Sequence, residues 1–469
     1  MADIDPTQTQ LFIDDEIIEH QTLLERVVHQ PVRPPGNPVL SPRMPWEGDS
    51  IEFLAGVYRD PQLEKFRMWY VCSASVGGYR NFVCTAESND GIHWSRPDLD
   101  RYRDLTDGAN NVVYATEQKL DGPTILYAPD DANPWKLVFY RGGSVFVGES
   151  EDGIRWQMPD EHDNPVLPRF GDRTTALLDD RSPESIVIFS RDRDDMQQVQ
   201  KVRSIYRVGL SDPRTIRSES QLVLRPDLED GPYIEFYQMS AFRYESVYIG
   251  LIERYTTTEP PYADVELTIS RDSRQWRRLR PRAAFLGPPV GGRELGAFDS
   301  GCSTPGNSPP LRIGDALWFY YYGRPGFHGD RHMTHAGCIG IAKLRVDGFA
   351  SLRAGRREGW VTTRPFTWPG GTLQVNGRVE GGNLWNYEGR QDADGWLRVE
   401  VLDGRGSSIQ GLSRDDCEPL FRDSIVYEPA WAGQGQSALR KLEGQQIKLR
   451  FLLRAAEVYA FCAKGTVQK

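Results

Sequence analysis

The chain has 469 residues, of which 39% are hydrophobic and 26% charged, and its formal net charge is -10 at pH 7. This composition is typical of a soluble globular protein with two or three domains, and it includes no run of 18 apolar residues that would cross a membrane as a helix. The acidic charge argues against a nucleic acid partner, because phosphate binding depends on basic patches.

Two further features of the sequence concern compartment and cysteine chemistry. The first 20 residues show no basic segment followed by an apolar one, so a cytoplasmic location is expected. Six cysteines are scattered without a Cys-x-x-Cys pair. They are interpreted as buried thiols, so neither a zinc site nor a disulfide framework is predicted.

One short phrase recurs along the chain. It reads SNDGIHW at 88–94, SEDGIRW at 150–156 and SRDSRQW at 270–276, which corresponds to a repeat of about 60 residues. Each copy follows a run of β-branched and aromatic residues, and an Asp-Gly turn after such a run indicates a hairpin. The tryptophan that ends each copy is predicted to pack between neighbouring units, away from any ligand pocket.

The predicted strands follow in chain order. A strand at 11–20 is expected to complete or brace a ring. Five strand pairs with acid-rich turns are then predicted at 56–71, 124–141, 175–191, 240–255 and 309–323. Repeated four-stranded units without helical periodicity predict an all-β fold, a five-bladed β-propeller followed by a C-terminal β-sandwich. The expected boundaries are 1–39 for the lead-in, 40–355 for the propeller with the active site and 356–469 for the sandwich.

An acidic residue stands at the start of the first strand of every unit. These residues are Asp49, Asp121, Asp172, Glu235 and Asp299. First strands of a propeller begin at the same mouth of the channel, so these acids are predicted to converge on one pocket. Any single one also has a purely structural interpretation, because Asp before a strand is common turn chemistry.

Other residues near these positions suit a sugar ligand. Trp46 and Tyr237 are candidates for stacking on a ring, Arg173 and His328 for binding hydroxyls or tuning an acid, and Glu47 for substrate binding. The alternatives are a core position for Trp46, a structural ion pair for Arg173 and a solvated loop for His328. The histidine spacing in that loop matches no zinc signature, so neither a metal nor a cofactor is predicted.

Several segments resemble a known family. They are LFIDDEIIEH, GDRTTALL, YESVYIGL, SRDSRQWRR and GDALWFYYYG. They are similar to bacterial proteins described as glycosyl hydrolase family 32-like, or five-bladed propeller glycosidase-like, related in layout to families 43 and 130. The resemblance covers nearly the whole chain. By position it implies that the catalytic acids are Asp49, Asp172 and Glu235.

The expected function is a glycoside hydrolase that cleaves a small oligosaccharide or glycan fragment with a pair of carboxylates at the propeller mouth. Two alternatives remain open at this point. One is a carbohydrate-binding propeller without catalytic activity. The other is a phosphorylase of the family 130 type, for which Arg80, Arg173, Arg324 and Arg331 are the candidate phosphate ligands. A carbohydrate substrate is the expected partner, with no nucleic acid and no membrane.

Overall fold

The computed structural model describes residues 4–72, 81–103, 108–158, 165–168, 170–194, 202–212, 220–258, 262–292, 296–326, 337–380 and 395–465. Strands dominate, and helix in these residues is limited to the 3-10 turn η1 (Pro45–Glu47), the short helix α2 (Ser437–Arg440) and the single residue Arg103. Among the same residues, no helix has the length and apolar character needed to span a bilayer. The predicted all-β class is confirmed.

The chain divides into two compact units. The larger unit comprises residues 31–278 and 284–343, and the smaller unit comprises 1–30, 279–283 and 344–469.

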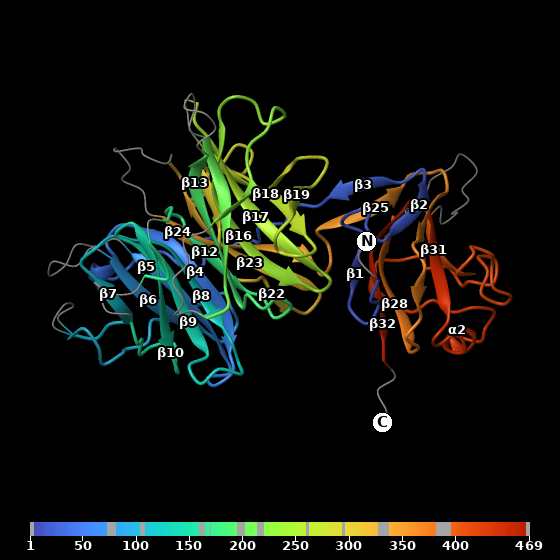
Figure 1. Cartoon of the computed structure of the whole chain (residues 1–469), viewed down its shortest axis with the longest axis horizontal. Helices are drawn as coiled ribbons and strands as arrows, with labels where there is room; N and C mark the ends of the chain where they lie inside the picture. The colour runs from blue at the N-terminus through green and yellow to red at the C-terminus, as the bar shows by residue number, and fades with distance from the viewer. Residues whose placement is uncertain are drawn as a thin grey trace. The chain divides into compact units, whose positions relative to one another are not determined.

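Four sheets form the larger unit (Figure 1). The first contains β4 (Ile51–Asp60), β5 (Lys65–Cys72), β6 (Asn81–Ser88) and β7 (Val112–Thr116). The second contains β8 (Leu120–Tyr127), β9 (Trp135–Arg141), β10 (Ser144–Ser150) and β11 (Leu167–Pro168). The third contains β12 (Thr175–Leu178), β13 (Ile186–Asp194), β14 (Val202–Leu210) and β15 (Gln221–Leu224).

The fourth sheet is larger and has nine strands. They are β16 (Ile234–Tyr244), β17 (Val247–Thr256), β18 (Tyr262–Ser270), β19 (Trp276–Arg278), β20 (Ala284–Leu286), β21 (Cys302–Pro305), β22 (Leu311–Ile313), β23 (Ala316–Arg324) and β24 (Cys338–Arg345). A parallel bridge between Ala263 of β18 and Cys302 of β21 joins its two halves. The fourth and fifth strand pairs predicted from the sequence therefore share one sheet.

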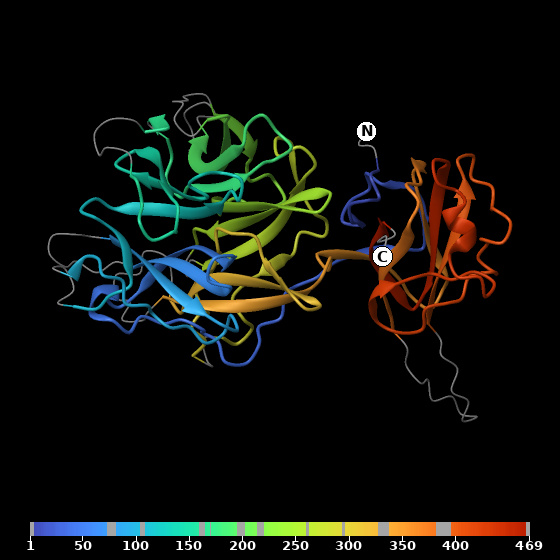
Figure 2. The ribbon, with the colours of Figure 1, turned by 90° about the horizontal axis from the view of Figure 1, so that it is seen from below.

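Successive sheets of the larger unit follow one another around a circle. In Figure 2 their colours run from blue through cyan, green and yellow to orange, which lies beside blue again. The first strands are neighbours in the same order, β4 beside β8, β8 beside β12 and β12 beside β16, and β23 of the last sheet returns to β4. The arrangement is β-propeller-like.

The circle is closed by residues that differ from the predicted ones. Phe12 and Ile17 belong to the segment at 11–20 expected to brace the ring. Both are buried in the core of the smaller unit. Instead, Val32 forms an antiparallel bridge with Lys343 and Leu40 with Ile339, both on β24. The apolar pattern at 11–20 indicates a buried segment, but it carries no information on which sheet that segment joins.

A buried amide links the first strands across the larger unit. The side chain of Asn307, which follows β21, donates to the Pro123 carbonyl on β8 at 2.8 Å and accepts from Gln238 Nε2 on β16 at 2.8 Å. Its backbone N–H donates to the Leu54 carbonyl on β4 at 3.2 Å. One residue that is 4% exposed thus connects three first strands of the ring, β4, β8 and β16.

The recurring phrase forms the same turn each time. In the first copy the Asp90 carboxylate accepts the backbone N–H groups of Ile92 and His93, both at 2.8 Å. Asp152 and Asp272 accept the corresponding N–H groups in the second and third copies at 2.7–2.9 Å. The turn therefore needs an aspartate at this position, because its carboxylate satisfies two backbone donors.

Each of these turns contacts a neighbouring sheet through one carbonyl. The carbonyl of Gly91 accepts from Tyr320 Oη at 2.8 Å, that of Gly153 from Trp69 Nε1 at 2.9 Å, and that of Ser273 from Arg207 Nε at 2.9 Å. The donors differ in type, whereas the accepting position in the turn is the same. The repeat therefore marks a contact between sheets.

The tryptophans of the phrase pack between sheets, as predicted. Trp94 contacts Tyr320 edge-on with ring centroids 5.9 Å apart, and Trp276 contacts Phe189 at 5.6 Å. Trp156 packs against the apolar cluster that joins the first and second sheets.

Two sheets form the smaller unit. The six-stranded sheet contains β1 (Gln10–Leu11), β3 (Glu25–Val28), β25 (Ala350–Ala354), β28 (Thr372–Val379), β30 (Ser424–Tyr427) and β32 (Ala456–Lys464). The five-stranded sheet contains β2 (Ile18–Thr22), β26 (Gly359–Thr363), β27 (Phe366–Thr367), β29 (Trp396–Asp403) and β31 (Gln446–Arg454). Apolar residues of both sheets form one core, in which the rings of Phe451 and Phe461 lie 5.5 Å apart.

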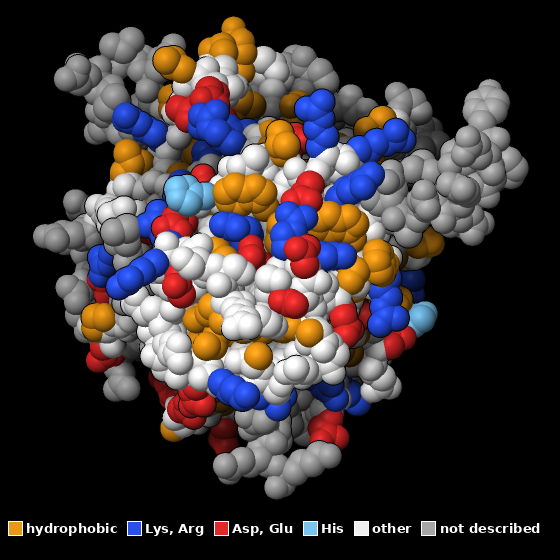
Figure 3. Space-filling view, turned by 90° about the vertical axis from the view of Figure 1, so that its right-hand side faces the viewer, with side chains coloured by type: hydrophobic (Ala, Val, Ile, Leu, Met, Phe, Trp, Pro, Cys, Tyr) orange, Lys and Arg blue, Asp and Glu red, His pale blue; other side chains and the backbone are white. Residues whose placement is uncertain are grey.

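The five-stranded sheet alternates buried apolar residues with outward polar and aromatic ones. Arg450 lies over the ring of Trp360 at 5.0 Å and forms an ion pair with Glu400 at 3.1 Å. The face drawn in Figure 3 likewise mixes basic and acidic side chains, with hydrophobic groups between them.

The contact between turn and sheet predicts a stability effect at Gly153. Its φ is +70°, and a Cβ there would lie 2.8 Å from Trp69 Cζ2 and 3.2 Å from Arg67 Nη1. Gly153→Ala is expected to lower the free energy of unfolding by about 2–5 kcal/mol, because backbone strain and overpacking add. Urea denaturation measures this change.

Gly314→Ala is the matched control for that substitution. Gly314 has a φ of +59°, and a Cβ there meets no described atom within 4 Å. Only the backbone strain of about 1–2 kcal/mol should therefore remain. Equal losses in the two variants would contradict a close contact at Gly153.

Candidate active site

A pocket of about 220 Å³ lies at the starts of the first strands of the larger unit. It is lined by Ser50, Glu52, Phe53, Lys119, Asp121, Asp172, Arg173, Arg191, Tyr237, Cys302, Thr304, Tyr322 and Arg324. Its volume is below the roughly 300–1,000 Å³ typical of pockets for drug-sized ligands, so it suits one small group or a single ring.

Irregular strand pairing turns side chains into this pocket. The register of β4 against β5 shifts between Ile51 and Phe53, at Glu52, and that of β16 against β17 shifts between Phe236 and Gln238, at Tyr237. The register of β8 against β9 also shifts directly after Asp121. Bulges of this kind are frequent beside active sites, because they redirect a side chain out of the regular alternation.

Three guanidinium groups surround the ring of Tyr237. The Cζ atoms of Arg191, Arg173 and Arg203 lie 3.7, 4.7 and 5.4 Å from its centroid. The ring itself packs against Tyr255 with centroids 5.3 Å apart. A π face attracts cations, so Tyr237 partly offsets the repulsion between these like charges.

Asp172 and Arg191 form a two-pronged ion pair. Arg191 Nε donates to Asp172 Oδ1 at 2.6 Å, and Nη2 donates to Oδ2 at 2.8 Å. Burial raises the pKa of Asp172, but the hydrogen bonds from Arg191 and the nearby guanidinium charges outweigh burial and hold it below its usual value. Asp172 is therefore ionised at neutral pH.

Arg173 is held in an unusual backbone conformation beside this pair. Its φ is +55°, and its backbone N–H donates to Asp121 Oδ1 at 3.1 Å. Its guanidinium lies between two rings, with Cζ 4.9 Å from the centroid of Phe53 and 4.7 Å from that of Tyr237. Burial lowers the pKa of Arg173, but the charges of Asp121 and Glu253 outweigh burial and raise it, so the side chain stays cationic.

Neutral groups complete the pocket. Burial raises the pKa of Cys302 to about 11 and that of Tyr322 to about 12, so both keep their protons at neutral pH. Cys302 is therefore a poor nucleophile, because the thiolate is the reactive form. Thr304 donates through its hydroxyl to Glu253 at 2.9 Å behind the pocket wall.

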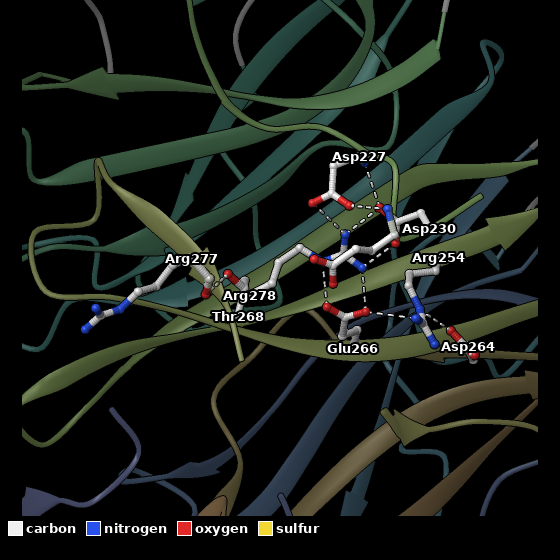
Figure 4. Close-up of polar contacts among 9 residues, drawn as sticks. Asp227, Asp230, Arg254, Asp264, Glu266, Thr268, Arg277 and Arg278 are labelled. Carbon is white, nitrogen blue, oxygen red and sulfur yellow. Dashed lines mark hydrogen bonds and ion pairs between the residues drawn. The ribbon is translucent and has the colours of Figure 1, made fainter. Parts of the chain in front are cut away.

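An ion-pair network fixes the segment before β16, the strand that carries Tyr237 (Figure 4). Arg278 donates to Asp230 at 2.6 Å and to Glu266 at 2.6 Å. Arg254 donates to Glu266 at 2.8 Å and to Asp264 at 2.8 Å. The network therefore connects the loop at Asp230 to β18.

The structure brings four of the predicted site residues together. Asp121, Asp172, Arg173 and Tyr237 all line the pocket. They come from the starts of β8 and β16 and from the segment before β12, as expected from the convergence of first strands.

The other two predicted catalytic acids lie elsewhere. Asp49 is exposed and is outside the set of described residues that line the pocket. Glu235 is two residues from Tyr237, but its carboxylate forms an ion pair with Arg203 and it also lies outside that set. Their catalytic roles remain predictions.

Trp46 and Glu47 occupy structural positions in η1, the turn before the first sheet. The Trp46 indole is buried and donates to Asn111 Oδ1 at 2.8 Å, and Glu47 forms a two-pronged ion pair with Arg96 at 2.6 and 2.9 Å. The interpretation of Trp46 as a core residue fits this placement, and neither side chain faces the pocket.

Of the last two predicted binding residues, Asp299 is absent from the pocket lining and His328 is not described. Asp299 is buried, 2.7 Å from Arg33 Nε and 2.8 Å from the Tyr321 hydroxyl. His328 lies outside the described residues, as do His332 and His335. Within the part of the chain that is described, no group of three or more His, Cys, Asp and Glu side chains is placed to hold a metal ion.

The sequence analysis missed several pocket residues. Glu52, Arg191 and Lys119 were not singled out, and Arg324 was considered only as a phosphate ligand. Glu52 lies three residues after the predicted Asp49, and the bulge in β4 that turns it inward has no sequence signature. Arg191 lies on β13, the second strand of its sheet, and its position is not marked by the acid that recurs at the starts of first strands.

Comparisons with known proteins give only distant similarities. No protein-family model and no curated protein matches the chain. A glycosyl hydrolase from Bacteroides ovatus shares 14% identity and covers 68% of this chain and 94% of its own, with a TM-score of 0.44. A β-1,2-mannobiose phosphorylase from Listeria innocua shares 11% identity over 68% of this chain and 97% of its own, with a TM-score of 0.45.

A thermostable family 43 glycoside hydrolase is similar at the same level. It shares 12% identity over 67% of this chain and 92% of its own, with a TM-score of 0.45. These structures belong to the broad group of glycoside-acting proteins that the sequence resembles. Similarity at this level transfers no activity, so the function has to be argued from the pocket.

The Asp172–Arg191 pair predicts a pH-dependent contribution to stability. Asp172 has a pKa below its usual value in the folded state. Its ionised form therefore favours folding above the unfolded pKa of about 4, and this contribution is lost as the pH falls through the lowered pKa. Asp172→Asn should lower the free energy of unfolding at neutral pH, and the difference from the wild type should shrink below about pH 4.

Urea denaturation at several pH values measures this effect. Asp49→Asn is the control, because Asp49 is exposed. A deficit in Asp172→Asn that stayed constant into the acidic range would contradict the ion pair as its cause.

Proposed function

We propose that the protein is a glycoside hydrolase whose larger unit is a five-bladed β-propeller. In this proposal the nine-stranded sheet supplies the fourth and fifth blades, which divide between β18 and β21. The two sheets of the smaller unit form a β-sandwich. The contacts that run from β4 through β8, β12 and β16 and return through β23 support the ring.

The observation that carries the functional proposal is the set of carboxylates in the pocket. Glu52, Asp121 and Asp172 come from three separate parts of the ring and line the same small volume. Glycosidic cleavage uses two carboxyl groups on opposite sides of the bond, one as proton donor and one as base or nucleophile. A pocket with several carboxylates and ring-stacking aromatic residues supports this chemistry.

The environment of each carboxylate favours a division of roles. Among the described residues Glu52 lines the pocket and has no ion-pair partner, so it is assigned as the proton donor. Asp121 accepts the backbone N–H of Arg173, and it is assigned as base or nucleophile. Asp172 is neutralised by Arg191, and it shapes the field in the pocket.

The residues implied by the family resemblance give a competing assignment. In it Glu235 is the general acid, Asp49 the base or nucleophile, and Asp172 a modulator of the acid. The ion pair between Glu235 and Arg203 disfavours this assignment, because it engages the Glu235 carboxylate away from a substrate.

A phosphorylase is the second candidate function. Arg173 and Arg324, two of the arginines considered as phosphate ligands, both line the pocket. In a phosphorylase, phosphate replaces water as the group that attacks the glycosidic carbon, so turnover requires added phosphate.

The two carboxylate assignments predict different kinetics. Glu52→Gln and Asp121→Asn should each reduce turnover of a glycoside by about 10²–10⁴, the usual effect of losing acid or base catalysis. Asp49→Asn should leave turnover near that of the wild type, because Asp49 is exposed and outside the pocket lining.

Steady-state kinetics of the three variants on a panel of aryl pyranosides and furanosides, with and without phosphate, measures this difference. Thermal melting confirms folding. Loss of activity only in Asp49→Asn would reverse the assignment. Sugar binding without turnover by the wild type on every substrate would favour a binding protein.

The identity of the proton donor predicts a dependence on the leaving group. An activated phenolate needs little protonation, so a variant without the general acid should lose less activity on activated aryl glycosides than on natural ones. Glu52→Gln should show this dependence and Glu235→Gln should not. A Brønsted plot of rate against leaving-group pKa tests it, and the opposite pattern would identify Glu235 as the acid.

A further inference from the structure

The pocket lining contains more basic than acidic residues, although the chain as a whole is acidic. The whole chain has a formal net charge of -10. Among the described residues that line the pocket, however, four are basic (Lys119, Arg173, Arg191 and Arg324) and three are acidic (Glu52, Asp121 and Asp172). Screening limits surface charges to about 10 Å, so the local groups decide what the pocket attracts.

The arginines around Tyr237 are not equivalent. Arg191 is neutralised by its two hydrogen bonds to Asp172, and Arg203 by its ion pair with Glu235. The nearest approach of a carboxylate to the Arg173 guanidinium is 3.9 Å, between Nε and Asp121 Oδ1. In the described part of the chain, Nη1 of Arg173 and Nη1 of Arg191 both have no hydrogen-bond partner, but Arg191 makes two other hydrogen bonds to a carboxylate whereas no carboxylate is at hydrogen-bond distance from Arg173.

Arg173 is also fixed in place. Its side chain is 12% exposed and is confined between the rings of Phe53 and Tyr237. Its left-handed backbone conformation, at a φ of +55°, costs an L residue about 1–2 kcal/mol. Asp121 and Glu253 offset the burial of this charge, but they leave the Nη1 donor without an acceptor among the described residues. A buried donor without an acceptor is costly, so a strained residue that holds one there favours a further binding partner.

We propose that this partner is an oxyanion, bound at Arg173 within the pocket. A guanidinium offers paired donors that match the oxygen atoms of a carboxylate, sulfate or phosphate. Within the proposed function, on which this inference rests, the anion is the acidic group of the glycan, a uronate carboxylate or a sulfate ester, or free phosphate. The volume of about 220 Å³ accommodates such a small group.

Isothermal titration calorimetry on the full chain tests the proposal without turnover. The probes are matched pairs that differ only at C6, where a carboxylate replaces a hydroxymethyl group, glucuronate with glucose and galacturonate with galactose, together with glucose 6-sulfate and inorganic phosphate. Charged probes should bind about tenfold or more tightly than their neutral partners, the scale of a charge-assisted hydrogen bond. The preference should weaken as salt is added.

Two substitutions with the same charge change locate the site. Arg173→Gln should abolish the preference for the charged probes. Arg243→Gln should retain it, because Arg243 lies outside the pocket lining and pairs with Asp180. Arg173→Lys keeps the charge and should retain part of the preference, and it replaces the glutamine variant if that variant melts early.

The outcomes separate the sources of the anion. Tight binding of uronates or the sulfated sugar, with weak binding of phosphate, makes the glycan the source. Tight binding of phosphate alone, with phosphate-dependent release of a sugar phosphate, makes free phosphate the source. Equal binding of charged and neutral probes, or an unchanged preference in Arg173→Gln, overturns the proposal.

The failure of this inference can be told apart from failure of the proposed hydrolase. Turnover of neutral glycosides with no preference for charged probes would refute the oxyanion site and leave the hydrolase intact. Preference for charged probes without cleavage of any glycoside would refute the hydrolase and leave the oxyanion site intact.

Discussion

The buried amide of Asn307 is the interaction on which the geometry of the larger unit depends. It joins β8 and β16 through its side chain and β4 through its backbone N–H. A propeller-like unit has no single sheet that spans it, so separate sheets must be held by side-chain packing and by such cross-links. Because the partners are buried main-chain and amide groups, they cannot be satisfied by water when the amide is lost.

The pocket is a consequence of the same constraint. The cross-links fix the middle of the first strands, so irregularities near their starts turn side chains inward without shifting the whole strand. Gly122 illustrates how closely these starts approach one another, since a Cβ there would lie 2.4 Å from the backbone of Thr174. Asp121 directly precedes Gly122, and Arg173 directly precedes Thr174. The packing of these two backbone segments therefore sets the distance between Asp121 and Arg173.

Sequence patterns predicted the repeated turn and part of the pocket. Of the five acids at strand starts, Asp121 and Asp172 line the pocket, whereas Asp49, Glu235 and Asp299 do not. The aspartate turn was recognisable because the backbone requires the same carboxylate in every copy, and its tryptophan follows at a fixed offset. Asp121 and Asp172 were found because strand starts converge. Glu52 and the N-terminal strands were missed or misplaced, because a bulge and the choice of partner sheet are decided by long-range packing, which leaves no mark in local alternation.

The electrostatics of the pocket connect its architecture with its proposed chemistry. Arginines 173, 191 and 203 around one tyrosine repel each other, and the structure offsets this with one carboxylate at hydrogen-bond distance from Arg191 and another from Arg203. Arg173 is left with aromatic rings and a carboxylate at 3.9 Å. A third close carboxylate would have neutralised it and removed the pocket's excess of positive charge. The same cation that attracts an anionic group also stabilises the ionised form of any nearby carboxylate, so the proton donor should be the pocket acid with the weakest contact to arginine. That condition favours Glu52.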